Sequence, residues 1–73
     1  MRNRLVQLSG YPSIPEGHDE SYINVDCVHE MWTERKIDIF GKSYWSYRIR
    51  MQGSGPRLIS EKDWKEIKRV LST

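Results

Sequence analysis

The chain has 73 residues, of which 37% are hydrophobic and 11% aromatic, and its net charge is +2. One domain fits this length, and three tryptophans supply enough apolar surface for a core, which excludes a fully disordered protein. The sequence contains no run of roughly 20 apolar residues, as a membrane helix requires, and too few apolar residues follow the basic start for a signal peptide. We therefore expect a soluble chain without a targeting segment.

The single cysteine and the charge distribution indicate the compartment and the kind of partner. Cys27 has no second cysteine to pair with, whereas small secreted domains are usually stabilised by disulfides, so we expect a cytoplasmic protein. Residues 1–34 carry two basic and six acidic side chains, and residues 35–73 carry ten basic and four acidic ones. This asymmetry fits an anionic partner for the second half, or two halves that neutralise each other in the fold.

The first predicted element is a short strand over Leu5–Leu8, which ends at a Ser-Gly turn. The segment Tyr11–Ser21 contains two prolines, a glycine and several acidic residues, and it is predicted to be a loop. Eleven residues is long for a loop in so small a domain, and long loops often make contacts. We therefore take Tyr11 and His18 as candidate partner-binding residues.

The middle of the chain alternates between apolar and polar residues, as strands do. Tyr22–Val25 is predicted to be a half-buried strand, after which Val28 and Met31 have the spacing of one helical turn. Lys36–Phe40 alternates again and stops at Gly41–Ser43, which predicts a hairpin turn into the next strand.

Residues 44–52 have the clearest period-2 pattern, which places alternate side chains on opposite faces of a strand. The predicted core face consists of Trp45, Tyr47, Ile49 and Met51. The predicted outer face consists of Tyr44, Ser46, Arg48 and Arg50.

The last part predicts a short strand and a helix. Gly53–Pro56 breaks the preceding strand, and Arg57–Ile59 can form one more. Ser60 is a favourable N-cap, so a helix is predicted from Glu61 to Leu71. Its expected core residues are Trp64, Ile67 and Leu71, and its expected outer ion pairs are Glu61 with Lys65 and Lys62 with Glu66.

Together these elements predict an α+β fold, in which a small antiparallel sheet of four to five strands packs against one C-terminal helix. Open edge strands in such a sheet favour pairing across a two-fold axis. We therefore expect a homodimer, with Leu5–Leu8 as its contact edge.

The sequence offers little for catalysis or metal binding. Cys27 and His29 have the spacing of a thiolate–imidazole pair on a strand, but a lone cysteine is more often a small buried residue. His18, Asp19, Glu20, Cys27 and His29 lack the spacing of metal-ligand pairs. We expect no catalytic residues, no metal and no cofactor, and hence a protein that is not an enzyme.

The outer row of Tyr44, Arg48 and Arg50 suggests one way to bind a polymer. An aromatic side chain beside cations on a sheet can hold single-stranded nucleic acid by stacking and phosphate contacts. The alternative interpretation is an ordinary solvated strand face whose charges are neutralised within the fold.

The segment Tyr22–Met31 resembles a motif of the small flagellar and swarming-motility family, which has relatives in phage genomes. The segment reads Y-I-N-V-D-C-V-H-E-M, and the motif is Y-I-N-x-D-x-I-x-x-I. The order of the flanking strands and the final helix is also similar. The resemblance implies a non-catalytic accessory protein with a small sheet and one helix, in which Asn24 satisfies the turn that follows it.

The sequence therefore predicts a small bacterial or phage accessory protein that binds and modulates a protein complex, without membrane contact. The alternative is a small nucleic-acid-binding protein that uses its basic and aromatic sheet face. Candidate contact residues are Tyr44, Arg48, Arg50, Tyr11 and His18.

Overall fold

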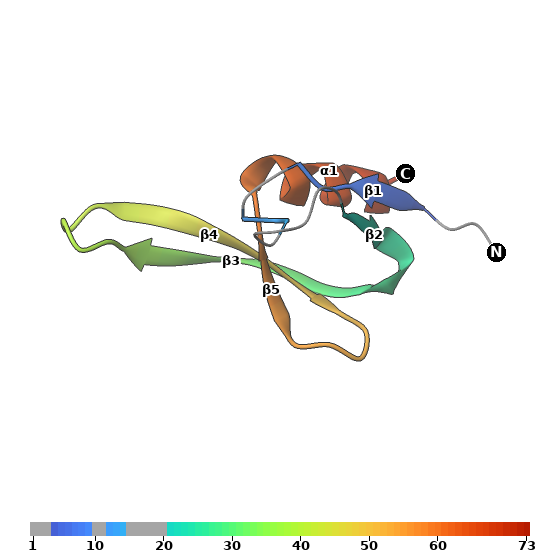
Figure 1. Ribbon diagram of the computed structural model, residues 1–73, viewed down its shortest axis with the longest axis horizontal. Helices are drawn as coiled ribbons and strands as arrows, with labels where there is room; N and C mark the ends of the chain where they lie inside the picture. Colours follow the sequence, from blue (N-terminus) through green and yellow to red (C-terminus); the bar gives the residue numbers. More distant parts are fainter. Residues whose placement is uncertain (1–3, 10–11, 15–20) are drawn as a thin grey trace.

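The computed structural model describes residues 4–9, 12–14 and 21–73. The elements in chain order are β1 (Leu5–Gln7), β2 (Tyr22–Asn24), the 3-10 helix η1 (Val25–Cys27), β3 (Val28–Ile37), β4 (Ser43–Met51), β5 (Pro56–Ile59) and α1 (Glu61–Leu71). Figure 1 shows α1 and the β1–β2 pair on the same side of the sheet that contains β3 and β4. The fold is α+β, with antiparallel strands and one C-terminal helix.

The described residues form five strands in two sheets, so the prediction of a single sheet of four to five strands is not confirmed. β1 pairs with β2, while β3, β4 and β5 form the second sheet in that order. The turn η1 lies between β2 and β3, so the chain leaves the first sheet before it enters the second. The predicted strands at Leu5–Leu8, Tyr22–Val25 and Arg57–Ile59 are confirmed as β1, β2 and β5, with bounds that differ by one residue.

The helical turn predicted around Val28 and Met31 is wrong, because both residues belong to β3. The turn lies just before them, in η1, where the side-chain oxygen of Asn24 accepts a hydrogen bond from the backbone N–H of Asp26 at 3.1 Å. This contact confirms the structural role that was expected for Asn24, since an Asn side chain commonly caps the turn that follows it.

The start of α1 is fixed by the predicted N-cap. Ser60 has extended backbone angles, and its hydroxyl oxygen accepts from the backbone N–H of Asp63 at 3.2 Å. Acidic residues lie in the first turn and basic residues in the last, as the helix dipole favours. The predicted helix is therefore confirmed at both ends.

The core lies where the two sheets meet α1. Its buried apolar residues are Val6, Leu8, Ile23, Val25, Ile49, Ile59 and Ile67. Trp64 is half-buried beside them: its ring meets that of Tyr47 edge-to-face with the centroids 5.5 Å apart, and its indole N–H donates to the carbonyl of Arg48 at 3.2 Å. The predicted docking of the helix through Trp64 and Ile67 is confirmed.

Two details of the predicted helix are wrong. Leu71 keeps 39% of its surface exposed, because the neighbouring Val70 packs against the core in the last turn. Glu61 pairs with Lys65 at 2.9 Å as expected, but Glu66 pairs with Arg69 and not with Lys62. The guanidinium group of Arg69 offers two N–H donors to the carboxylate, a geometry that a lysine cannot reproduce.

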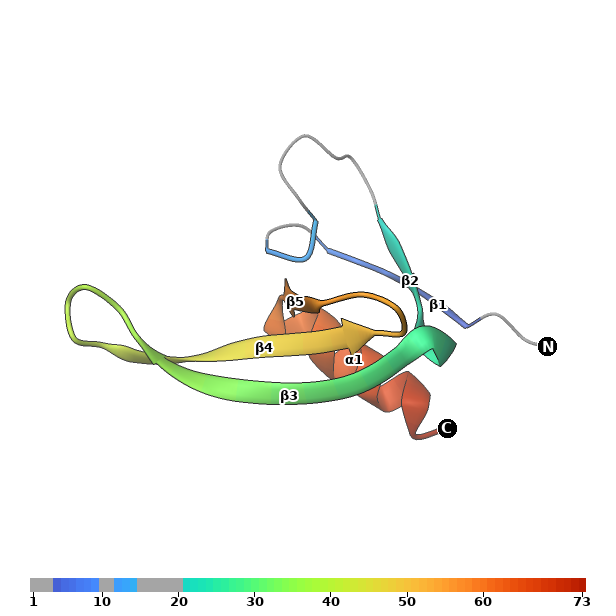
Figure 2. The ribbon, with the colours of Figure 1, turned by 90° about the horizontal axis from the view of Figure 1, so that it is seen from below.

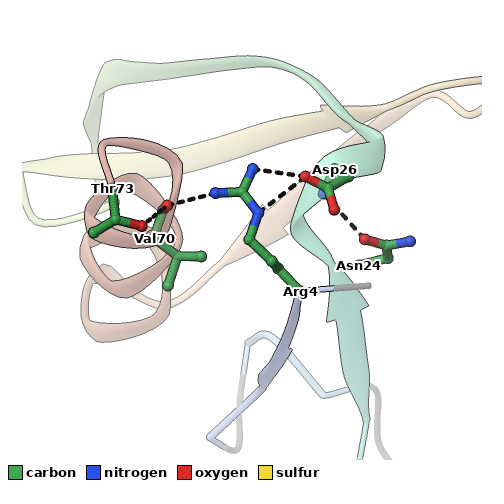
Figure 3. Close-up of polar contacts among 5 residues, drawn as sticks. All are labelled: Arg4, Asn24, Asp26, Val70 and Thr73. Atoms are coloured by element: carbon green, nitrogen blue, oxygen red, sulfur yellow. Dashed lines mark hydrogen bonds and ion pairs between the residues drawn. The ribbon is translucent and has the colours of Figure 1, made fainter. Parts of the chain in front are cut away.

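Arg4 connects β1 to η1 and to the C-terminal end of α1 (Figure 3). Its guanidinium donates to the Asp26 carboxylate at 2.6 Å and 3.0 Å, and to the Val70 carbonyl at 2.8 Å. The hydrogen bonds from Arg4 hold the pKa of Asp26 below its usual value. A cation at the helix C-terminus also interacts favourably with the dipole, so this cluster stabilises the fold.

Asp63 forms the other polar connection to α1, and it is buried with 3% exposure. Its carboxylate accepts from the backbone N–H of Ser9 at 2.9 Å and from the Ser9 hydroxyl at 2.8 Å. The hydroxyl oxygen of Ser13 accepts from the backbone N–H of Ser60 at 2.8 Å, next to this contact. Residues 12–14 of the predicted loop are thus docked on the helix start.

The pKa of Asp63 predicts how stability depends on pH. Burial alone would raise this pKa, but hydrogen bonds from Ser13, Ser9 and Ser60 outweigh that effect and lower it. The folded protein therefore favours the carboxylate, which stabilises the fold above the unfolded pKa of about 3.9 and stops doing so as the pH falls through the lower folded pKa.

We expect the free energy of unfolding to decrease between about pH 5 and pH 2, and to decrease less steeply in Asp63→Asn. Urea denaturation of both proteins over this range measures the two slopes. Equal slopes would show that Asp63 does not contribute to the pH dependence of the free energy of unfolding.

No helix in the described ranges is long and apolar enough to cross a membrane.

Candidate interaction surface

β3 and β4 form a hairpin that extends well beyond the rest of the molecule (Figures 1 and 2). The molecule measures 47 × 28 × 22 Å and has a radius of gyration of 13.0 Å, against about 11 Å for a compact chain of this length. Among the described strands β5 pairs only with β4, over residues 47–50, so the third strand of the sheet supports only the base of the hairpin. We call residues 35–45, the part beyond this base, the arm.

The turn of the arm is held by Asp38. One of its carboxylate oxygens accepts from the backbone N–H groups of Phe40 and Lys42, each at 2.9 Å. Gly41 has a φ of +80°, in the left-handed region that glycine adopts without strain. The turn therefore has a defined shape, and the strand predicted over Lys36–Phe40 ends at Ile37 because Asp38 starts the turn earlier.

The arm exposes five large apolar or aromatic side chains, which we call the tip residues: Ile37, Ile39, Phe40, Tyr44 and Trp45. Ile39 and Phe40 in the turn are 93% and 81% exposed, and Ile37 is 72% exposed. Tyr44 and Trp45 are 53% and 57% exposed. Ile37 and Trp45 lie on one face of the hairpin and Tyr44 lies on the other, with Ile39 and Phe40 in the turn. Exposed apolar side chains at one end of a hairpin are available to a partner that encloses it, and aromatic residues often supply most of the binding energy in such contacts.

The charges around the tip residues are mainly positive. Arg35, Lys36 and Lys42 lie on the arm, and Asp38 is the only acidic residue on it. Lys36 forms an ion pair at 3.6 Å with Glu34, just below the arm. The Asp38 carboxylate is already engaged by backbone N–H groups. The arm thus offers an apolar end with a basic rim.

The prediction that Trp45 belongs to the core is wrong. Trp45 does share a face with Tyr47 and Ile49, as the alternation indicates, and it lies opposite Arg35 on β3. However, α1 packs against the base of this face, and Trp45 lies beyond the part of β4 that β5 covers. The alternation therefore predicts the correct face for Trp45, on the helix side of the sheet, but this part of the face lies outside the core.

The opposite face of the hairpin base carries a charge ladder, which consists of Glu30, Glu34, Arg48 and Arg50. Arg48 forms an ion pair with Glu34 at 2.6 Å, and Arg50 forms one with Glu30 at 3.3 Å. The guanidinium of Arg50 also lies 5.6 Å from the centre of the Trp32 ring.

Tyr44, Arg48 and Arg50 lie on one face of β4, as predicted, but at different points along the hairpin. Tyr44 lies on the arm among the tip residues, whereas Arg48 and Arg50 lie at the base and already have acidic partners on β3. Tyr11 and His18, the other candidate contact residues, lie outside the described residues.

Cys27 and His29 do not form the pair that their spacing suggested. Cys27 lies in η1 and His29 in β3, so the two residues are not on one strand as the spacing argument assumed. Among the described residues, which exclude residues 15–20, no three potential metal ligands lie together.

The sequence interpretation missed four of the five tip residues: Ile37, Ile39, Phe40 and Trp45. A local signal was present, because an Asp three residues before a Gly often starts a turn with its side chain. That signal would have placed Ile39 and Phe40 in an exposed turn.

Comparisons of the chain with models of protein families, with curated proteins and with solved structures found no match.

Proposed function

We propose that this chain is a small non-enzymatic accessory protein, of bacterial or phage type, that binds and modulates a protein complex through its arm. The observation that carries the proposal is the exposure of the five tip residues on a projecting hairpin with a defined turn. The motif at Tyr22–Met31, which resembles that of the small motility proteins, supports an accessory role.

A protein partner with an apolar groove and an acidic rim would fit the arm best. Burial of Phe40 and Ile39 would supply hydrophobic free energy, and Trp45 and Arg35 are of the residue types most often found at binding hot spots. The basic rim would steer the arm toward an acidic surface and fix its orientation. Because Asp38 holds the turn in shape before binding, little conformational entropy would be lost.

Nucleic acid is the second candidate, because aromatic and basic residues are also adjacent on the arm. The charge ladder argues against it, because the two arginines of the predicted binding face, Arg48 and Arg50, already form ion pairs with Glu34 and Glu30. Fluorescence anisotropy with labelled single- and double-stranded oligonucleotides should show binding no tighter than about 10⁻⁴–10⁻⁶ M at physiological salt. A submicromolar, salt-sensitive complex that Arg48→Ala/Arg50→Ala weakens would favour the alternative.

Affinity capture from bacterial lysate tests the protein-binding proposal. We expect the wild-type chain to retain a defined protein partner after nuclease treatment, and Ile39→Ser/Phe40→Ser to lose it. A partner that is released by nuclease, or is retained equally by the variant, would contradict the proposal.

A further inference from the structure

The outer edge of β3 is the longest open strand edge that the structure describes. β3 has ten residues, and of the described strands only β4 pairs with it. Figure 2 shows β3 along the outside of its sheet, with no described strand beyond it. The other edge strands are short: β5 has four residues and begins with a proline, and β1 and β2 have three each.

This edge lacks several of the features that prevent strand pairing. Proteins protect edges with short strands, prolines, bulges or charged side chains. The charged residues of β3, which are Glu30, Glu34, Arg35 and Lys36, are of both signs and can therefore complement those of a second strand. The pairing register of β3 with β4 shifts once, between Val28 and Glu30 at the beginning of β3. From Glu30 to Ile37 the strand is regular and contains no proline or glycine. A run of backbone N–H and C=O groups is therefore available to another strand.

We propose that β3 pairs in antiparallel fashion with β3 of a second copy of this chain, around a two-fold axis at Thr33. The expected contact edge of the dimer thus moves from the three-residue β1 to β3. Residues that lie opposite each other in such a pair share one face and contact each other directly. In this register Glu30 lies opposite the partner's Lys36, and Lys36 lies opposite the partner's Glu30. Within one chain Glu30 lies 3.3 Å from Arg50 and Lys36 lies 3.6 Å from Glu34, so the contacts across the axis would extend these ion pairs into a network.

Charge complementarity selects both the partner and the register. Moving the axis to Trp32 places Glu30 opposite the partner's Glu34. Moving it to Glu34 or to Arg35 places that residue opposite its own copy. Like charges directly opposite each other are destabilising, so of the axes from Trp32 to Arg35 only the one at Thr33 avoids them and also forms the two symmetric Glu–Lys pairs.

The dimer would have a continuous six-stranded sheet, in which the two arms point in opposite directions. At about 3.4 Å per residue, the turns would lie roughly 45 Å apart. Such a module could engage two binding sites at once, which raises avidity. The dimer goes beyond the proposed function and does not depend on it.

Complementary charge reversal tests this pairing by analytical ultracentrifugation at micromolar concentrations. We expect a wild-type dimer of twice the 8.7 kDa monomer mass. Lys36→Glu and Glu30→Lys each place like charges at both symmetric positions, so each variant alone should dissociate at least tenfold more readily. An equimolar mixture should form a heterodimer, because every Glu again lies opposite a Lys.

Lys42→Glu is the matched control, since it makes the same charge change in the turn and away from the edge. It should remain dimeric. Circular dichroism verifies that each variant is folded. A wild-type monomer at high micromolar concentration, a dimer that is unaffected by Lys36→Glu, or a mixture of folded variants that stays monomeric would overturn the proposal.

Discussion

Ile67→Ala should destabilise the protein by about 2–5 kcal/mol, the usual range for truncation of a fully buried isoleucine. Ile67 is 0% exposed and lies in the cluster where α1 meets both sheets. A domain of this size has a free energy of unfolding of roughly 4–11 kcal/mol, so the loss would be a large share of the total. Chemical denaturation followed by circular dichroism measures it.

Leu71→Ala is the matched control on the same helix. Leu71 is 39% exposed in the last turn, and we expect its truncation to change the free energy of unfolding by less than about 1 kcal/mol. Equal losses in the two variants would mean that Leu71 is part of the core, as the helical spacing alone suggests.

Ile39→Ser/Phe40→Ser should weaken partner binding by more than tenfold and leave stability almost unchanged. Both side chains are more than four-fifths exposed, at 93% and 81%, so their removal uncovers no core. Loss of one aromatic hot spot commonly costs about 2 kcal/mol or more, and each 1.4 kcal/mol is about a factor of ten in affinity. Titration with the captured partner and thermal denaturation measure the two effects.

Leu5→Ser/Tyr22→Ser provides the control for general loss of surface hydrophobicity. These two side chains are 61% and 51% exposed on the β1–β2 sheet, away from the arm. This variant should bind like the wild type. A similar loss of affinity in both double variants would indicate that binding depends on exposed apolar surface in general and not on the arm.

Local signals in the sequence were sufficient to predict α1 and most strands. Ser60 and Asp63 mark the start of the helix, and the alternation over residues 44–52 places Tyr47 and Ile49 on the core side. These features depend on residues close together in the chain. The role of Asn24 was also predictable, because its hydrogen bond spans only two residues.

The remaining features depend on contacts between distant segments. Alternation gives the face on which Trp45 lies, but it does not show that α1 and β5 cover only the base of the hairpin. The ion pairs of Arg48 and Arg50 depend on the register between β3 and β4. The burial of Asp63 depends on Ser9, which lies 54 residues away in the chain. Because these contacts join distant segments, the sequence alone indicated Tyr44, Arg48 and Arg50 as the candidate site, whereas the structure indicates the arm.

Hydroxyl-radical footprinting of the free protein and of its captured complex tests the role of the arm most directly. Mass spectrometry then measures the labelling of each exposed side chain. We predict strong labelling of Phe40 and Trp45 in the free protein and strong protection of both in the complex, while Tyr22 is labelled equally in the two states. Unchanged labelling of Phe40 and Trp45, with protection elsewhere, would contradict the conclusion that the arm is the binding surface.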